Sequence, residues 1–222
     1  MALQSAIYFK AKFMNYPELA FTPAVKALQE RYGSRSSYAR MENFHYTDGM
    51  TESEMEFIES QDHFYMASIS GNGYPYIQYR GGPPGFLKVL DKNTLAFLDF
   101  SGNKQYITTG NLVTNNHLAL FLLDQASQTR LKLFADGEVL ELDSHSGLTS
   151  ELTLQDYKYK PERIYRMTVK AYDWNCQQHI TPRYTLAEIG EHFEAQHDYM
   201  EQLRKENAEL KAKLAKSTLL AK

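Results

Sequence analysis

The stretch KAYDWNCQQHITPRYT, residues 170–185, brings together the most reactive side chains of the chain. It contains the only tryptophan, Trp174, the only cysteine, Cys176, and also His179. A thiol and an imidazole three residues apart meet if the segment is helical, and such a pair is the nucleophile and base of cysteine enzymes. A catalytic thiolate also needs an orienting third group and a site for the oxyanion, which the sequence does not specify. A packed corner or the edge of a ligand site therefore fits the stretch better.

The loop SGNKQYITTGN, residues 101–111, is a candidate anion site. Ser101, Gly102 and Asn103 offer backbone N–H groups and polar side chains just before an expected short helix, and Lys104 adds a positive charge. A loop of this composition at the start of a helix suits a phosphate group. The chain has neither the P-loop motif nor the glycine motif of dinucleotide-binding proteins, so the prediction rests on composition.

Other reactive residues give weaker signals. Arg80, Lys88, Arg130 and Lys132 lie on or beside expected strands, where each taken singly is an ordinary solvated side chain. The seven histidines are scattered without metal-binding spacing, and one cysteine cannot form a cysteine-pair zinc site. We therefore expect no metal centre, and no side chain stands out as a general base. The catalytic residues stay unassigned.

Length and composition are those of an ordinary globular protein. A chain of 222 residues with 43% apolar residues can bury a sizeable core. The net charge of −3 argues against a nucleic-acid-binding surface, which needs a basic excess on one face. No run of eighteen apolar residues and no cleavage pattern at the start are present, so the sequence predicts a cytoplasmic protein without a membrane span.

Two helices are expected before residue 62. In FTPAVKALQERYGSR, Thr22 can cap a helix that Gly33 ends. In MTESEMEFIESQ, Thr51 and Glu54 form a capping box. From residue 64 the pattern changes to strands with a turn signal about every ten residues, which favours a barrel or a sandwich. The strand-like segments are FYMASIS, YIQYR, GFLKVLD, TLAFLDF, LALFLL, RLKLFADGEVLELD and RIYRMTVKAYDW.

The last part of the chain has a heptad pattern. Its a and d positions, spaced alternately by three and four residues, are Leu186, Ile189, Phe193, Gln196, Met200, Leu203, Asn207, Leu210 and Leu214. Asn207 at an a position, with Glu206 at g and Lys211 at e, favours a parallel two-helix coiled coil between subunits. The alternative is one long helix packed along its own domain, and Gln196 at a d position keeps that alternative open.

The order of four segments resembles the pyridoxamine 5'-phosphate oxidase-related proteins. These segments are YIQYRGGPPGFLKVLD, TLAFLDFSGNKQYITTGNLVTNNHLALFLL, TRLKLFADGEVLEL and YDWNCQQHITPRYT. The resemblance implies a mainly β fold, a six-stranded split barrel with peripheral helices that forms a homodimer and binds FMN at the subunit interface. It divides the chain into an N-terminal helical extension at 1–49, the FMN-binding barrel at 50–184 and a C-terminal helix at 185–222.

The resemblance also implies cofactor contacts at matching positions of this chain. Those positions are Arg80, Lys88, Leu98, Asp99, Ser101, Asn103, Lys104, Gln105, Arg130, Lys132, Trp174 and Arg183. Residues 101–105 match the loop that cradles the phosphate, and the main chain of Leu98 and Asp99 matches the wall of the flavin ring. Arg130 and Lys132 match a strand that often comes from the second subunit.

The implied activity is that of an FMN-dependent oxidoreductase acting on an unidentified small molecule, with NADH or NADPH as a candidate reductant. The chain continues as a long helix after Arg183 and lacks the C-terminal pattern for a substrate phosphate, so activity on pyridoxamine phosphate is not expected. Two alternatives stay open. One is a non-enzymatic flavin-binding dimer that recruits a partner through its C-terminal helix, and the other is a related barrel that binds a deazaflavin or haem, with His179 as the candidate axial ligand.

Overall fold

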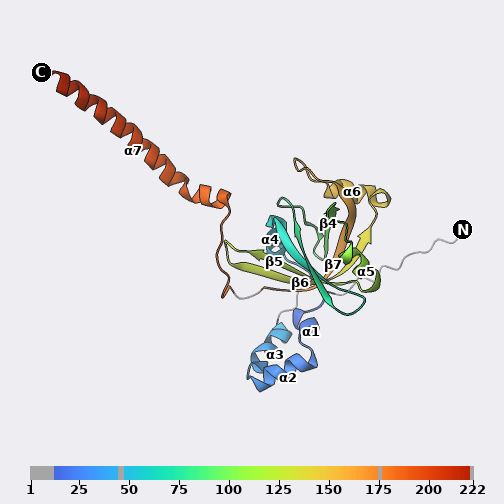
Figure 1. The fold of residues 1–222 in the computed structure, drawn as a ribbon. Helices are drawn as coiled ribbons and strands as arrows, with labels where there is room; N and C mark the ends of the chain where they lie inside the picture. The colour runs from blue at the N-terminus through green and yellow to red at the C-terminus, as the bar shows by residue number, and fades with distance from the viewer. Residues whose placement is uncertain (1–12, 45–47, 175–176, 221–222) are drawn as a thin grey trace. The chain divides into compact units, whose positions relative to one another are not determined.

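A seven-stranded antiparallel sheet forms the centre of the protein (Figure 1). The computed structural model describes residues 13–44, 48–174 and 177–220. The strands are β1 His63–Ile69, β2 Pro75–Gly81, β3 Lys88–Asp91, β4 Thr94–Phe100, β5 His117–Asp124, β6 Thr129–Leu140 and β7 Pro161–Trp174. Every strand-like segment of the sequence is confirmed, and the sheet has one strand more than the six that the resemblance implied.

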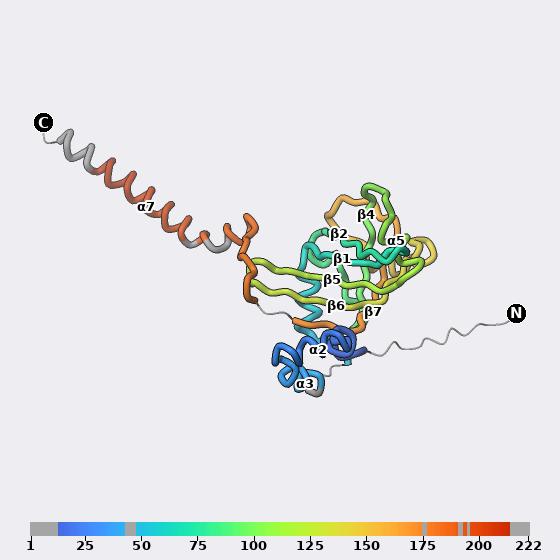
Figure 2. Tube along the Cα trace, turned by 60° about the horizontal axis from the view of Figure 1, so that its bottom comes forward, coloured from blue at the N-terminus to red at the C-terminus, as the bar shows by residue number. Residues whose placement is uncertain are grey.

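The sheet order is β2-β1-β5-β6-β7-β4-β3, and Figure 2 shows the strands from β2 to β7 lying side by side in that order. Phe64 on β1 nevertheless contacts Phe97 on β4 edge to face, with ring centroids 5.4 Å apart. Phe86, just before β3, stacks on Phe64 with the centroids 5.7 Å apart. Since three strands separate β1 from β4, these contacts require the sheet to curl into an open barrel.

The inner face of the barrel follows the two-residue period of the strands. Phe64 and Met66 on β1, and Leu118, Leu120 and Leu122 on β5, are buried, whereas their sequence neighbours are partly exposed. The mainly β fold with peripheral helices that the sequence predicted is therefore confirmed, and its core is the inside of the curled sheet.

The N-terminal part of the chain contains the short helices α1 Tyr16–Ala20, α2 Pro23–Arg31 and α3 Arg35–Phe44. The expected cap of α2 is confirmed, because the Thr22 hydroxyl accepts the Val25 N–H at 3.4 Å and Gly33 follows in the left-handed region with φ +76°. Helices α1 and α3 were not predicted. The Tyr16 ring of α1 stacks on Phe134 of β6 with the centroids 5.3 Å apart, so a tertiary contact holds this short helix.

Helix α4, Glu52–Ser60, is tied to the far end of β7. Its predicted capping box is confirmed, because the Thr51 N–H donates to a Glu54 carboxylate oxygen at 2.8 Å. The other carboxylate oxygen accepts the Trp174 indole N–H at 2.5 Å, and the Trp174 ring packs on Phe57 edge to face at 4.9 Å. Burial raises the pKa of Glu54, but the hydrogen bonds from Thr51 and Trp174 more than offset it, so this pKa lies below its usual value.

The remaining helices of the barrel unit are α5 Ile107–Thr114, η1 Asp143–His145 and α6 Ser146–Leu152. Helix α5 is the short helix expected after the polar loop. Leu152 at the end of α6 is buried with Leu98 of β4 and Ile164 of β7 in a second, smaller core. This packing fixes the ends of β4 and β7, which carry the candidate site described below.

Helix α7, Leu186–Leu220, belongs to a second compact unit together with residues 180–185 and the turn at 125–127. The helix begins with a capping box: the Thr185 N–H donates to the Glu188 carboxylate at 2.6 Å, and the Glu188 N–H donates back to the Thr185 hydroxyl at 3.2 Å. Within the described ranges, no helix combines the length and the apolar character needed to cross a membrane.

Replacing Trp174 by phenylalanine keeps a ring against Phe57 and removes the N–H donor to Glu54. We expect the free energy of unfolding to fall by about 1–3 kcal/mol, because a mostly buried carboxylate loses a charged hydrogen bond. Urea denaturation followed by circular dichroism measures this, since Trp174 is the only tryptophan. The control Tyr184→Phe changes an exposed ring and should stay within about 0.5 kcal/mol of the wild type. Equal stability of the Trp174→Phe variant and the control would contradict the anchoring role of Trp174.

Candidate functional site

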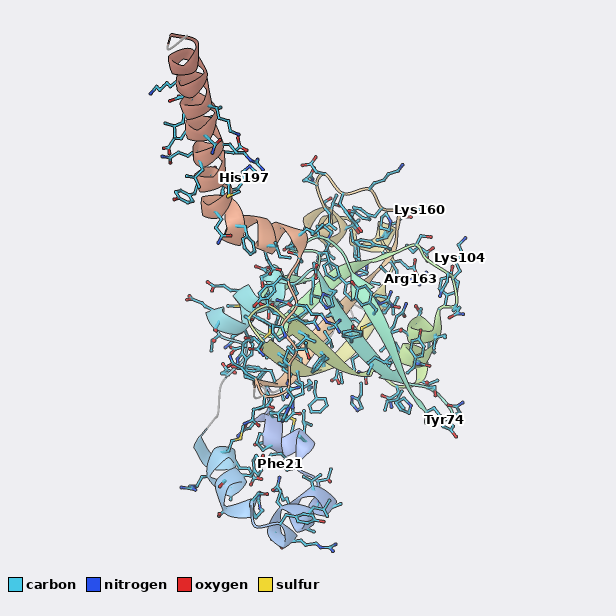
Figure 3. The ribbon with its side chains drawn as sticks, turned by 60° about the vertical axis from the view of Figure 1, so that its left-hand side comes forward. Phe21, Tyr74, Lys104, Lys160, Arg163 and His197 are labelled. Atoms are coloured by element: carbon cyan, nitrogen blue, oxygen red, sulfur yellow. The ribbon has the colours of Figure 1, made fainter. Side chains whose placement is uncertain are left out.

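A polar pocket lies where the ends of β2, β4 and β7 meet the loop at 101–106 and the start of α5. Its volume is about 140 Å³. Arg80 of β2, Asp99 of β4, Lys104 of the loop, Thr109 of α5 and Arg163 of β7 all line it. Figure 3 shows Arg163 on the same side of the protein as Lys104 and Lys160. The pocket therefore joins three strands that are not all neighbours in the sheet.

The carboxylate of Asp99 is the centre of this pocket. One oxygen accepts a hydrogen bond from the Arg80 guanidinium at 2.6 Å, and the other accepts one from the Arg163 guanidinium at 3.0 Å. Asp99 is 5% exposed, and it lies directly opposite Arg163 in the register of β4 and β7. A buried carboxylate needs such partners, because an isolated charge in the interior is strongly unfavourable.

Aromatic and hydroxyl groups fix the two guanidinium groups in place. The Cζ atom of Arg80 lies 5.2 Å from the centroid of the Tyr165 ring, and that of Arg163 lies 4.7 Å from the centroid of the Tyr106 ring. Arg163 also donates to the Thr109 hydroxyl at 3.2 Å, and that hydroxyl shares a hydrogen bond of 2.7 Å with the Tyr165 hydroxyl. Both cations are thus held before any ligand arrives.

The charge of the pocket is positive by one unit, since three cationic side chains, Arg80, Lys104 and Arg163, stand against Asp99 and Glu162. Burial raises the pKa of the Asp99 carboxyl, while the charges of the two arginines act in the opposite direction. Burial also opposes the charge of Arg163, but the nearby Asp99 carboxylate outweighs it and raises the pKa of that guanidinium. The pocket is therefore suited to an anion.

Two further features indicate that a ligand with acceptor oxygens completes the pocket. The Nε atom of Arg80 is buried and has no hydrogen-bond partner within the described part of the chain. Helix α5 begins at the pocket with Ile107, and its N-cap residue Tyr106 supplies no side-chain cap. The N–H groups of a first helical turn have no acceptor inside the helix, so they remain available to an anion.

The structure brings part of the predicted cofactor set together. The pocket includes Arg80, Asp99, Asn103, Lys104 and Gln105. Leu98 lines an adjoining hollow, described below, and Ser101 belongs to the same loop, where its N–H donates to the Lys160 carbonyl at 2.8 Å. Lys88 lies at the start of β3, opposite Ala96 of β4, and does not line the pocket.

Four other predicted residues lie apart from the pocket. Arg130 and Lys132 are on β6, where Lys132 pairs with Asp173 at 3.0 Å. Trp174 lies eleven residues beyond Arg163, at the opposite end of β7, and does not line the pocket. Arg183 is exposed in the segment before α7.

No contact of the described residues supports a catalytic cysteine or a haem site in the stretch at 170–185. His179 is exposed and has a left-handed backbone, with φ +65°. Cys176 lies outside the described residues, so the structure does not test the Cys–His pair that the sequence analysis disfavoured. Among the residues that the structure describes, no three histidine, cysteine or acidic side chains lie close enough together to hold a metal ion.

The most informative residue that sequence reasoning missed is Arg163. A signal for it existed: Asp99 follows the apolar run TLAFL, and a carboxylate at the end of a buried strand requires a cation on a neighbouring strand. RIYRMTV begins with such a cation. Thr109 and Tyr165 carried no comparable signal, because hydroxyl groups are common in strands and helix starts.

Comparison with known proteins gives one sequence family and several similar folds. The model of the family described as pyridoxamine 5'-phosphate oxidase matches residues 50–171. No curated protein sequence matches the chain. A pyridoxamine 5'-phosphate oxidase designated putative, from Lactobacillus delbrueckii, is 20% identical, with a TM-score of 0.45 and coverage of 57% of this chain and 95% of that one.

Two other solved structures are similar over the same region. An FMN-binding protein from Syntrophomonas wolfei is 11% identical, with a TM-score of 0.43 and coverage of 66% of this chain and 97% of that one. An F420 reductase is 17% identical, with a TM-score of 0.40 and coverage of 58% and 98%. Likeness at this level says nothing about which cofactor this chain binds.

Replacing Asp99 by asparagine removes the negative charge between two guanidinium groups. We expect the free energy of unfolding to fall by about 3 kcal/mol, because two half-buried guanidinium groups lose the buried carboxylate that they share. Inorganic phosphate should restore more stability to this variant than an equal ionic strength of chloride does. Urea denaturation measures both effects, with Glu138→Gln as the control, since Glu138 forms an exposed ion pair with Arg166. A loss of stability that phosphate does not reduce would contradict an anion site at this position.

Proposed function

Because this chain belongs to the pyridoxamine 5'-phosphate oxidase family, we propose that its pocket holds the phosphate group of FMN and that the protein is a cytoplasmic FMN-dependent oxidoreductase. The observation that carries the proposal is the pair of half-buried arginines on the buried Asp99, one of which keeps a buried N–H without an acceptor. A phosphate dianion offers several acceptor oxygens and takes charged hydrogen bonds from guanidinium groups more strongly than from neutral donors.

A second hollow beside the first suits the flavin ring. It has a volume of about 190 Å³ and shares Gln78, Arg80 and Phe100 with the phosphate pocket. Phe86 and Phe97 supply apolar walls, and further residues of β2 and β4 line the rest of the hollow. An isoalloxazine ring needs such a flat apolar wall, with hydrogen-bonding groups at its rim that tune the potential.

Both hollows are small for a whole cofactor, since sites for drug-sized ligands measure about 300–1,000 Å³. We therefore propose that a second copy of the chain covers the rest of FMN in a homodimer. Exposed apolar side chains of β2 support this, because Ile77 is 63% exposed and Tyr79, which also lines the second hollow, is 57% exposed. Tyr65 of β1 lies opposite Tyr79, so the apolar surface continues onto the next strand.

A homodimer also gives a role in cofactor binding to the predicted residues that do not line the pocket of their own subunit. Under this proposal Arg130, Lys132, Trp174 and Arg183 reach the cofactor of the other subunit and not that of their own. Lys132 and Trp174 are already held by Asp173 and Glu54, so their contribution would be a fixed wall of the cleft.

FMN, when bound, supplies hydride transfer between a reductant and a small-molecule substrate. The residues of this chain bind and orient it. Arg80 and Arg163 fix its phosphate end, and the aromatic side chains of the second hollow exclude water. No histidine or cysteine lines either hollow among the described residues, so this chain offers positioning and electrostatic stabilisation more than proton transfer.

Purified protein should absorb in the flavin bands and release a compound with the mass of FMN. Anaerobic addition of NADH or NADPH should then bleach the bands, if one of them is the reductant. A sharp Soret band, or a released compound with the mass of a deazaflavin, would assign another cofactor. If the protein contains a flavin that neither NADH nor NADPH reduces, the alternative of a non-enzymatic flavin-binding protein is favoured.

Replacing Arg163 by glutamine should weaken FMN binding about 10-fold to 100-fold, because a charged hydrogen bond contributes about 1.5–3 kcal/mol and each 1.4 kcal/mol is tenfold. Fluorescence titration of the apoprotein measures this. Arg166→Gln is the matched control, since Arg166 lies three residues along the same strand and pairs with Glu138 at 2.6 Å.

Lys104→Ala provides a second variant that should fold normally, because Lys104 is on an exposed loop. It should weaken FMN binding by a smaller factor. Wild-type affinity in both the Arg163 and the Lys104 variants would show that the phosphate binds elsewhere.

A further inference from the structure

Helix α7 carries a row of exposed apolar side chains that its own compact unit does not cover. Phe193 is 54% exposed, Met200 51%, Leu203 40% and Leu210 64%. With Leu186, Ile189, Gln196 and Asn207 they occupy the a and d positions of the heptads, and we call this row the seam. Apolar side chains aligned along one face of a long helix are typical of a surface that a partner covers.

We propose that the seam binds the same seam of a second copy of this chain, as a parallel two-stranded coiled coil. The spacing of three and four residues continues without interruption from Leu186 to Leu210. A repeat of seven residues matches a left-handed supercoil of two such helices, in which each a or d side chain enters a hole on the other helix. A partner with the same repeat is therefore the occupant that fits the seam over its whole length.

Charges beside the seam select the parallel orientation. The ionisable side chains at the e positions are His197, Arg204 and Lys211, whereas the g positions include the acidic Glu206. In a parallel coil the g position of one helix lies near the following e position of the other, so Glu206 meets the second copy's Lys211. In an antiparallel coil e positions face e positions, which would bring arginine and lysine side chains together.

Asn207 points to the same arrangement. It is exposed and occupies an a position among apolar neighbours, where Met200 precedes it by one heptad. In a parallel coil in register, a positions meet their own copies, so two Asn207 side chains pair across the interface. A polar pair of this kind fixes register and favours two strands at a cost in stability.

This interface is separate from the cofactor site and does not depend on FMN. It is compatible with a barrel homodimer, because the two-fold axis of a parallel coiled coil runs along the coil and one closed dimer has one such axis. Helix α7 would then hold the two subunits together even before the cofactor binds.

Disulfide cross-linking of the full chain tests the proposal. In a Cys176→Ser background, Asn207→Cys places one cysteine at the a position, and Lys205→Cys places one at the outward f position of the preceding heptad. Under oxidised and reduced glutathione, the Asn207→Cys protein should form a covalent dimer at least about tenfold faster than the Lys205→Cys protein, since only a-position thiols come within disulfide distance. Equal rates would overturn the coiled coil.

A second pair of variants tests whether cross-linking depends on the packing of the seam. Adding Leu203→Asp to the Asn207→Cys protein should abolish cross-linking, whereas Ala208→Asp, at the exposed b position, should leave it unchanged. The FMN content of all variants should stay that of the wild type. Failure of cross-linking with normal FMN content would reject the coil alone, and normal cross-linking without FMN would reject only the proposed cofactor.

Discussion

The shared carboxylate of Asp99 is the interaction on which both the fold and the site depend. Arg80 comes from the edge strand β2, and Asp99 and Arg163 come from β4 and β7 at the other side of the sheet. No backbone pairing joins β2 to β4 among the described residues, so side chains hold the curled sheet together at this end. Phe64, Phe86 and Phe97 do the same inside the barrel. The candidate site therefore lies at the split of the barrel, between strands β2 and β4, which do not pair with each other in the described sheet.

Three buried or half-buried charges, those of Arg80, Asp99 and Arg163, meet at this place. Removing one partner of a buried ion pair leaves another charge unpaired, which is strongly unfavourable. An anion would provide hydrogen-bond acceptors for guanidinium N–H groups that Asp99 does not bind, including the N–H at the Arg80 Nε atom. Because such a ligand binds only the folded state, it also stabilises the fold. A phosphate-bearing cofactor would then contribute to the closing of the barrel.

The sequence predicted those elements whose signal is local. The two-residue period predicted the strands, and Thr22 and Thr51 predicted the starts of two helices. The composition of residues 101–104 indicated the anion loop. What it could not show depends on contacts between distant residues. Helix α3 is held by Asn15, whose side-chain amide donates to the Glu42 carbonyl at 3.0 Å from 27 residues away in the chain. Trp174 is held by Glu54, 120 residues away in the chain.

The geometry of Arg80, Asp99 and Arg163 bears most directly on the phosphate group of the proposed cofactor. Calorimetric titration of the wild-type apoprotein with FMN and with riboflavin compares two ligands that differ only in the phosphate group. Charged hydrogen bonds to two guanidinium groups predict that FMN binds about 100-fold more tightly than riboflavin, or more. Equal affinity for the two ligands would contradict a phosphate site on Arg80 and Arg163.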